Sequence, residues 1–141
     1  MIVLDSDHLS LLQHPASRQG AHLLQAINQA AETNFVTTVV SLEEHLRGWL
    51  AAIHRAKAVE GQIIFYRELQ DLVTFFRRWT VLPFNHRAAQ TFTELRSQGV
   101  RIGSMDLKIA SIVMTHDATL LSANLRDFER VPGLRVEDWI K

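Results

Sequence analysis

Cysteine is absent from this sequence of 141 residues. Its absence excludes a disulfide-stabilised scaffold, a thiolate metal site and a cysteine nucleophile. An excess of either charge is also lacking, because 15 lysines and arginines balance 15 aspartates and glutamates. A protein without a net positive field can bind nucleic acid only through a local basic patch or through metal ions.

Glycine and proline are scarce, with six and three residues, so no linker or domain boundary is evident. No apolar run approaches the roughly 20 residues of a membrane-spanning helix. The first residues, Met1 to Asp5, lack the basic and apolar regions of a signal peptide. At this length, folding buries about 68–70% of the chain's surface, enough for one core. We therefore expect a single soluble, cytoplasmic domain over residues 1–141.

Short apolar segments alternate with segments of helical periodicity along the chain. The expected strands are Met1–Leu4, Phe35–Val39, Val81–Phe84, Thr119–Ser122 and Leu134–Val136. The expected helices are Ser6–Gln13, Ala21–Ala31, Leu42–Ile53, a long helix or helical pair over Val59–Trp79, one that stops at Gly99, and Ser104–Met114. Such alternation is typical of a parallel sheet covered on both faces. The sequence thus predicts a three-layer α/β/α fold with a central, mostly parallel sheet of four to five short strands.

Residues 59–79 carry two apolar stripes at helical spacing. One stripe is Phe65, Leu69, Leu72 and Phe76, and the other is Ile63, Tyr66 and Val73. Two stripes exceed what a helix with one buried face requires. A helical hairpin that buries both stripes within the monomer is one explanation. We favour the other, a surface for a partner protein or a second copy.

Four carboxylates stand where a parallel sheet places its functional residues. Asp5 ends the first strand, and Glu44 is expected in the first turn of the helix after the second strand. Asp106 is expected in the first turn of the helix from Ser104, and Asp127 follows the fourth strand. Sites in such sheets form beyond the carboxyl ends of the strands. We therefore expect these carboxylates at equivalent ends of βα units.

Clustered carboxylates repel one another, and a divalent cation relieves that repulsion. Mg²⁺ prefers oxygen ligands and, in such sites, assists the attack of water at phosphorus. Each acidic residue taken alone is equally well explained as a helix cap or a partner of the helix dipole. Ser104 is expected to be the N-cap of the helix that carries Asp106. Only the conjunction of the four carboxylates favours a metal site.

Five segments resemble the PIN-domain family, in that family's order. They are Leu4–Leu9, Ser41–Gly48, Ile102–Ala110, Leu121–Phe128 and Val131–Trp139. In the second segment the register matches Glu44 rather than Glu43. The branch that the chain most resembles is that of the VapC-like toxins of type II toxin–antitoxin systems.

The resemblance implies a Mg²⁺- or Mn²⁺-dependent endoribonuclease that leaves a 5′-phosphate and a 3′-hydroxyl. Asp5, Glu44 and Asp106 would be the acidic core that holds the metal. Asp127 is the better candidate for the fourth ligand, with Asn124 in support. The resemblance also implies an antitoxin partner, which can place a basic side chain in the acidic site, and a homodimer.

Other polar residues of these segments are candidates for supporting the site or binding substrate: Ser6, Asp7, Ser104, Ser122, Asn124, Arg47 and Arg101. The serine hydroxyls can hydrogen-bond a carboxylate or a phosphate, and the arginines can neutralise phosphates or remain solvated. Asp7 either supports the metal ligands without binding the metal itself, or interacts with the dipole at the N-terminus of the first helix. Gly48, one turn after Glu44, permits close approach of another chain or tight helix packing.

Two other functions fit parts of the sequence. Asp5-Ser6-Asp7 after an apolar strand is also how haloacid dehalogenase-like phosphatases begin, but Leu9 stands where those enzymes need threonine or valine. A non-catalytic PIN-like module that binds RNA or protein is the second alternative. Four histidines lack metal-site spacing and are interpreted as surface or core residues: His8, His45, His54 and His116. Of these, His8 is also a minor candidate for supporting the metal ligands without binding the metal.

Overall fold

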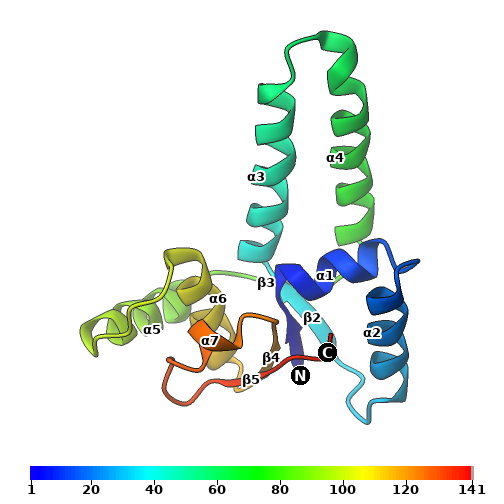
Figure 1. Ribbon diagram of the computed structural model, residues 1–141. Helices are drawn as coiled ribbons and strands as arrows, with labels where there is room; N and C mark the ends of the chain where they lie inside the picture. Colours follow the sequence, from blue (N-terminus) through cyan, green and yellow to red (C-terminus); the bar gives the residue numbers. More distant parts are fainter. Residues whose placement is uncertain (141) are drawn as a thin grey trace.

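The computed structural model describes residues 1–140, which form a five-stranded parallel sheet with strand order β3-β2-β1-β4-β5. The strands are β1 (Ile2–Leu4), β2 (Phe35–Thr38), β3 (Val81–Leu82), β4 (Thr119–Leu121) and β5 (Arg135–Glu137). The helices are α1 (Ser6–Gln13), α2 (Arg18–Gln29), α3 (Val39–Arg55), α4 (Ile63–Phe76), α5 (His86–Ser97), α6 (Ser104–Thr115) and α7 (Leu125–Phe128), with a short 3₁₀ helix, η1 (Val59–Gln62). Helices lie on both sides of the sheet, so the predicted α/β/α fold is confirmed (Figure 1).

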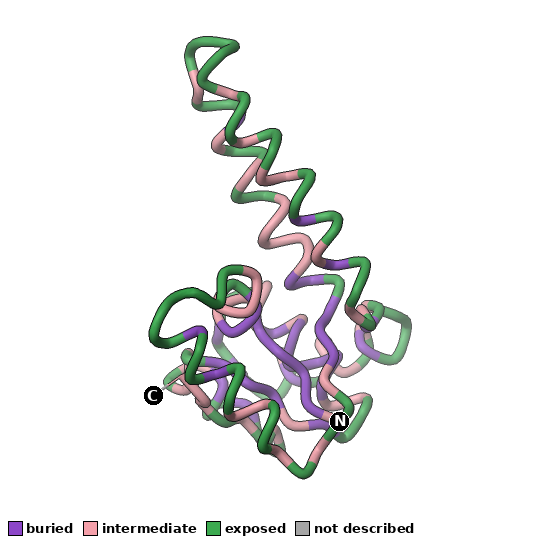
Figure 2. The backbone as a smooth tube through the Cα atoms, turned by 90° about the vertical axis from the view of Figure 1, so that its right-hand side faces the viewer, coloured by how far each residue is buried: buried purple, intermediate pink, exposed green. Residues whose placement is uncertain are grey.

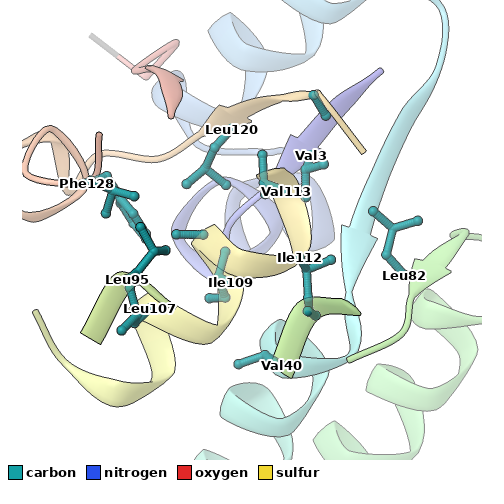
Figure 3. Packing of buried hydrophobic residues seen from close by; sticks show 14 of the residues in the cluster. Val3, Val40, Leu82, Leu95, Leu107, Ile109, Ile112, Val113, Leu120 and Phe128 are labelled. Carbon is teal, nitrogen blue, oxygen red and sulfur yellow. The ribbon is translucent and has the colours of Figure 1, made fainter. Parts of the chain in front are cut away.

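Two buried clusters cover the two faces of the sheet. Val3 and Leu120 belong to one cluster, with side chains of α5, α6 and α7 (Figure 3). Leu4 and Leu121 belong to the other, with Leu72 of α4 and residues of α1. Successive side chains of a strand point to opposite faces, so neighbouring residues of β1 and β4 serve different clusters. The short apolar runs are therefore strands buried on both faces.

Helix α6 is the most deeply buried of the helices that contribute to the first cluster. Its buried positions include Leu107, Ile109, Ile112 and Val113, each with none of its surface exposed. The hydroxyl of Ser111 donates to the Leu107 carbonyl oxygen at 2.7 Å, which satisfies a polar group inside the core. This packing holds the N-terminus of α6, and with it Asp106, against the sheet.

The N-terminus of α3 differs from the prediction. The Thr38 hydroxyl oxygen accepts from the Ser41 backbone N–H at 3.1 Å, and this cap starts the helix at Val39. The expected strand therefore ends one residue earlier. Glu44 lies in the second turn of α3, and its predicted position in the first turn is wrong.

The N-terminus of α6 also differs from the prediction. Gly103, in an extended conformation, is the N-cap, and Ser104 is the first helical residue. The prediction that Ser104 caps the helix is wrong. Asp106 does lie in the first turn, but α6 follows α5 with no strand between them. Asp106 is thus not at the end of a βα unit, although the helix brings it to the same edge of the sheet.

Helices α3 and α4 form a hairpin that projects from the sheet (Figure 1). The rings of Trp49 and Phe65 lie 6.3 Å apart between the two helices. Ile63, Tyr66 and Val73 remain between 54% and 57% exposed along α4, and the outer part of the hairpin is largely exposed (Figure 2). One stripe therefore packs inside the hairpin and the other does not, so the explanation that the monomer buries both is wrong. Within residues 1–140, no helix combines the length and apolarity needed to cross a membrane.

Candidate functional site

Asp5 lies at the carboxyl end of β1, where it caps α1. Its Oδ1 accepts from the Ser6 backbone N–H at 2.7 Å, and its Oδ2 accepts from the Ser122 hydroxyl at 2.8 Å. Only 6% of the residue is exposed. Burial and then the charge of Asp7 raise the pKa of Asp5 to about 7, although both hydrogen bonds oppose the shift. A carboxyl group with this pKa is only about half ionised near neutral pH.

Asp7 is held by the turn that follows β4. Its Oδ2 accepts from the Ala123 backbone N–H at 2.9 Å, and its Oδ1 lies 2.7 Å from Nδ1 of His8. Burial disfavours the ionised carboxylate, but the hydrogen bonds from His8 and Ala123 outweigh it and lower the pKa of Asp7. Asp7 is therefore the cluster's ionised member with the most extensive hydrogen bonding, which fits a supporting role.

Glu44 faces the cluster from α3. Burial, followed by the charge of Asp106, raises the pKa of Glu44. Its Oε1 and the Ser6 hydroxyl are buried, and neither has a hydrogen-bond partner within 3.5 Å among the described residues. The Ser6 hydroxyl is still near enough to Glu44 to oppose the rise of its pKa. A buried carboxylate oxygen without a donor is costly unless a cation or solvent compensates it.

Asn124 bridges the remaining two carboxylates. Its Nδ2 donates to Asp106 Oδ2 at 3.0 Å and to Asp127 Oδ2 at 3.1 Å. Burial and the charge of Asp127 raise the pKa of Asp106, although Asn124 opposes the shift. Asn124 therefore holds the carboxylates of Asp106 and Asp127 next to each other, and which of Asn124 and Asp127 is the fourth ligand stays a prediction.

The charge of Asp7 raises the pKa values of Asp5, Glu44 and Asp106, and the charge of Asp127 also raises that of Asp106, so these carboxyl groups lie near one another. Within residues 1–140, no three His, Asp or Glu side chains lie close enough together, as arranged in this structure, to hold a metal ion. Hydrogen bonds from Ser122 and Asn124 engage several of the oxygens instead. The unpartnered oxygen of Glu44 and the all-oxygen donor set fit a hard divalent cation such as Mg²⁺.

The other predicted residues divide into two groups. Ser122 is central, because it donates to Asp5 and its oxygen accepts from the Asn124 backbone N–H at 3.0 Å. Arg47 pairs instead with Glu43 at 2.7 Å on the exposed face of α3. The structure records no side-chain hydrogen bond or ion pair for Arg101 or Ser104 within residues 1–140, and both are exposed.

Gly48 is exposed on α3, one turn from Glu44. A methyl group added to its Cα would meet no atom of the described residues within 4 Å. Tight helix packing is therefore the wrong explanation for this glycine. Close approach of a substrate or partner at Gly48 stays a prediction.

Thr37 and His8 also support the site, although the sequence carries only a weak signal for either. The buried Thr37 hydroxyl donates to the Leu4 carbonyl oxygen at 3.0 Å and so supports the end of β1. His8 is fully buried and contacts Asp7, although its position in the sequence carries no metal-site spacing. His45 is half-buried beside Phe76, and burial lowers its pKa. His54 and His116 are exposed, as expected for surface histidines.

The chain is similar in sequence to proteins named VapC, while no family model matches it. It is 36% identical over 77 residues to the tRNA(fMet)-specific endonuclease VapC of Salmonella typhimurium, covering 52% of this chain and 58% of that protein. It is 37% identical over 78 residues to ribonuclease VapC2 of Haemophilus influenzae, covering 52% and 59%. The matched segment thus spans somewhat more than half the length of these relatives.

The fold matches solved VapBC structures over nearly the whole chain. The match to DNA-bound VapBC from Salmonella typhimurium has a TM-score of 0.74 at 25% identity and covers 98% of this chain and 97% of that chain. The match to VapBC-1 from nontypeable Haemophilus influenzae has a TM-score of 0.75 at 22% identity and covers both chains fully, at 100%. The chain is thus similar in sequence to VapC proteins over about half of its length, and it shares the fold of the solved VapBC structures over nearly all of it.

Proposed function

We propose that this protein is a divalent-metal-dependent endoribonuclease and the toxin of a toxin–antitoxin pair. The observation that carries the proposal is the gathering of carboxylates at the carboxyl edge of the sheet, where burial and mutual repulsion raise three pKa values. The names of its relatives, ribonuclease VapC and tRNA(fMet)-specific endonuclease VapC, support RNA as the substrate. They favour this function over the phosphatase alternative.

Asp5, Glu44, Asp106 and Asp127 would hold Mg²⁺ or Mn²⁺. When bound, such an ion supplies a Lewis acid for the scissile phosphate and lowers the pKa of a coordinated water. Asn124 orients two of the carboxylates, and Ser122 orients Asp5. Because Asp5 has a pKa of about 7, it must lose its proton to become a ligand. Metal affinity is therefore expected to rise as the pH increases through neutrality.

Cleavage of RNA by the purified protein tests this function directly. We expect mixed cellular RNA, with initiator tRNA as a separate substrate, to be cut in Mg²⁺ or Mn²⁺. In EDTA the rate is expected to fall at least about a hundredfold, because the clustered carboxylates then lack their counter-ion. Equal cleavage in EDTA and Mg²⁺ would contradict the metal requirement. The absence of cleavage by folded, metal-loaded protein on every RNA would favour the non-catalytic binding module.

We also propose that the antitoxin binds the α3–α4 hairpin. The hairpin patch, defined as Leu50, Val59, Ile63, Ile64, Tyr66 and Val73, comprises side chains that are each more than half exposed. Several large apolar side chains exposed along one hairpin favour a protein interface there. Similar folds occur in VapBC structures, which supports a partner of the VapB kind. A homodimer remains part of the proposal.

Adding charge to the hairpin patch tests the partner surface. We expect Tyr66→Lys to weaken antitoxin binding about a hundredfold, because burying an unpaired ammonium group is costly. RNA cleavage and thermal stability should persist, since Tyr66 is 54% exposed and lies outside the acidic cluster. Gln70→Lys, which adds the same charge at an exposed position on the same helix, is the matched control.

Isothermal titration measures antitoxin binding, and light scattering measures the oligomeric state. Unchanged antitoxin affinity in Tyr66→Lys would contradict the proposed surface. If the variant instead becomes monomeric while the wild type is dimeric, the hairpin patch joins two copies of this chain.

A further inference from the structure

His8, in the first turn of α1, has none of its surface exposed, yet both ring nitrogens have partners. Nδ1 lies 2.7 Å from Asp7 Oδ1, and Nε2 lies 3.2 Å from the backbone nitrogen of Trp139. A backbone N–H can only donate, so Nε2 must accept and carry no proton. The ring proton is therefore on Nδ1 and is donated to Asp7. This pattern of partners favours one tautomer of the ring, with the proton on Nδ1.

Asp7 transmits this arrangement to the acidic site. Its Oδ1 is engaged by His8, while its Oδ2 accepts from the Ala123 backbone N–H at 2.9 Å. Ala123 is the neighbour of Ser122, whose hydroxyl donates to Asp5 at 2.8 Å. A connected path of hydrogen bonds and one peptide link thus runs from the Trp139 backbone to Asp5.

The C-terminal tail, defined as Asp138–Ile140, follows β5. The Trp139 ring packs edge-on against Phe35, with 6.1 Å between the ring centroids. Asp138 Oδ1 accepts from the Ile140 backbone N–H at 2.8 Å and lies 3.8 Å from His8 Nε2, beyond hydrogen-bond distance. Trp139 N–H is therefore the group that occupies the acceptor nitrogen of His8.

We propose that His8 is a positioning residue that couples the C-terminal tail to the acidic site. With the tail docked, Nε2 is occupied and the proton stays on Nδ1, where it holds Asp7. Without Trp139, the ring is free to carry its proton on Nε2, and Nδ1 then presents a lone pair to the Asp7 carboxylate. Asp7 Oδ1 would then keep only the His8 backbone N–H, at 2.6 Å, and its hold on the Ala123 turn would weaken. The effect on catalysis rests on the proposed function, whereas the hydrogen-bonded coupling does not.

Nuclear magnetic resonance of histidine nitrogens tests the coupling without any assay of activity. In the full chain we expect a protonated Nδ1 and an unprotonated Nε2 at His8. In a chain ending at Asp138 we expect a mixture of the two tautomers and faster exchange of the Ala123 amide hydrogen. His86→Asn, at an exposed histidine of α5, is the control and should change neither signal. A protonated Nε2 in the full chain, or an Ala123 amide indifferent to the loss of the tail, would overturn the proposal.

His8→Asn separates coupling from a simple packing role. An asparagine amide nitrogen near the Nδ1 position always donates and has no second tautomer. Loss of Trp139–Lys141 should slow RNA cleavage about tenfold in the wild type, as expected for a residue that supports metal ligands. In the His8→Asn background the same truncation should slow RNA cleavage little further. Equal losses in both backgrounds would mean that the tail is merely structural and would overturn the proposal.

Two outcomes keep this inference distinct from the proposed function. If the wild type cleaves no RNA but its His8 tautomer depends on the tail, the ribonuclease proposal fails and the coupling stands. If the shortened chain does not fold, His8→Phe in the full chain serves instead, because it removes both nitrogens. It should speed exchange at Ala123 and Trp139, and His8→Asn should restore protection at Ala123 alone. Failure of that restoration would overturn the coupling.

Discussion

Replacing Asp106 by asparagine is expected to lower the rate of RNA cleavage about 10²- to 10³-fold, because the proposed metal site would lose one charged ligand worth several kcal/mol of transition-state stabilisation. The fold is expected to persist. Asparagine keeps an oxygen that accepts from Asn124, whose Nδ2 now donates to Asp106 at 3.0 Å. It also removes the repulsion from Asp127 that helps raise the pKa of Asp106. Single-turnover cleavage and thermal melts of Asp106→Asn measure the two effects.

Asp71→Asn is the matched control for this prediction, since Asp71 is an exposed carboxylate on α4. It should leave cleavage unchanged. Full activity in Asp106→Asn would remove Asp106 from the proposed ligand set. A large loss of stability in EDTA, where no cation is bound, would instead show that Asp106 is needed mainly for folding.

Replacing Asp5 by asparagine is expected to stabilise the metal-free protein at alkaline pH. The folded pKa of about 7 exceeds the ordinary value of 3.8, so the folded state binds more protons than the unfolded chain between these limits. The free energy of unfolding therefore falls as the pH rises through this window, by roughly 4 kcal/mol for this group alone. Asp5→Asn removes this loss because the amide does not ionise.

Urea denaturation in EDTA at pH 4, 6 and 8 measures this effect. Asp5→Asn and the wild type should have similar stability near pH 4, and the variant should gain progressively toward pH 8. Asp117→Asn is the control, since the Asp117 side chain is 92% exposed. If the wild type instead gained stability relative to Asp5→Asn between pH 4 and pH 8, the pKa of Asp5 would not be raised in the folded state.

The fold and the acidic residues were predictable because their signals are local. An apolar run ended by Asp5 describes a strand buried on both faces with a polar group at its carboxyl end. The period of the apolar residues separated the two stripes of α4, of which Leu72 became buried and Tyr66 remained exposed. Local periodicity could not decide whether the second stripe would be covered.

Helix boundaries were less predictable because competing local preferences are nearly equal. Val39 is β-branched and continues the apolar run of β2, which favours a strand. The Thr38 cap makes it the first residue of α3 instead, and this moved Glu44 into the second turn. At α6, the extended Gly103 took the cap position that a serine commonly fills.

The order of apolar and acidic residues along this chain determined its parallel α/β architecture and the identities of its candidate ligands. Only the tertiary structure decided how those ligands are held. Asn124 donates to Asp106 across 18 residues of chain, and His8 meets Trp139 across 131. Contacts between residues so far apart depend on how the layers pack, and packing leaves no periodic pattern in the sequence. Burial likewise set the raised pKa of Asp5, because desolvation is a property of the whole fold.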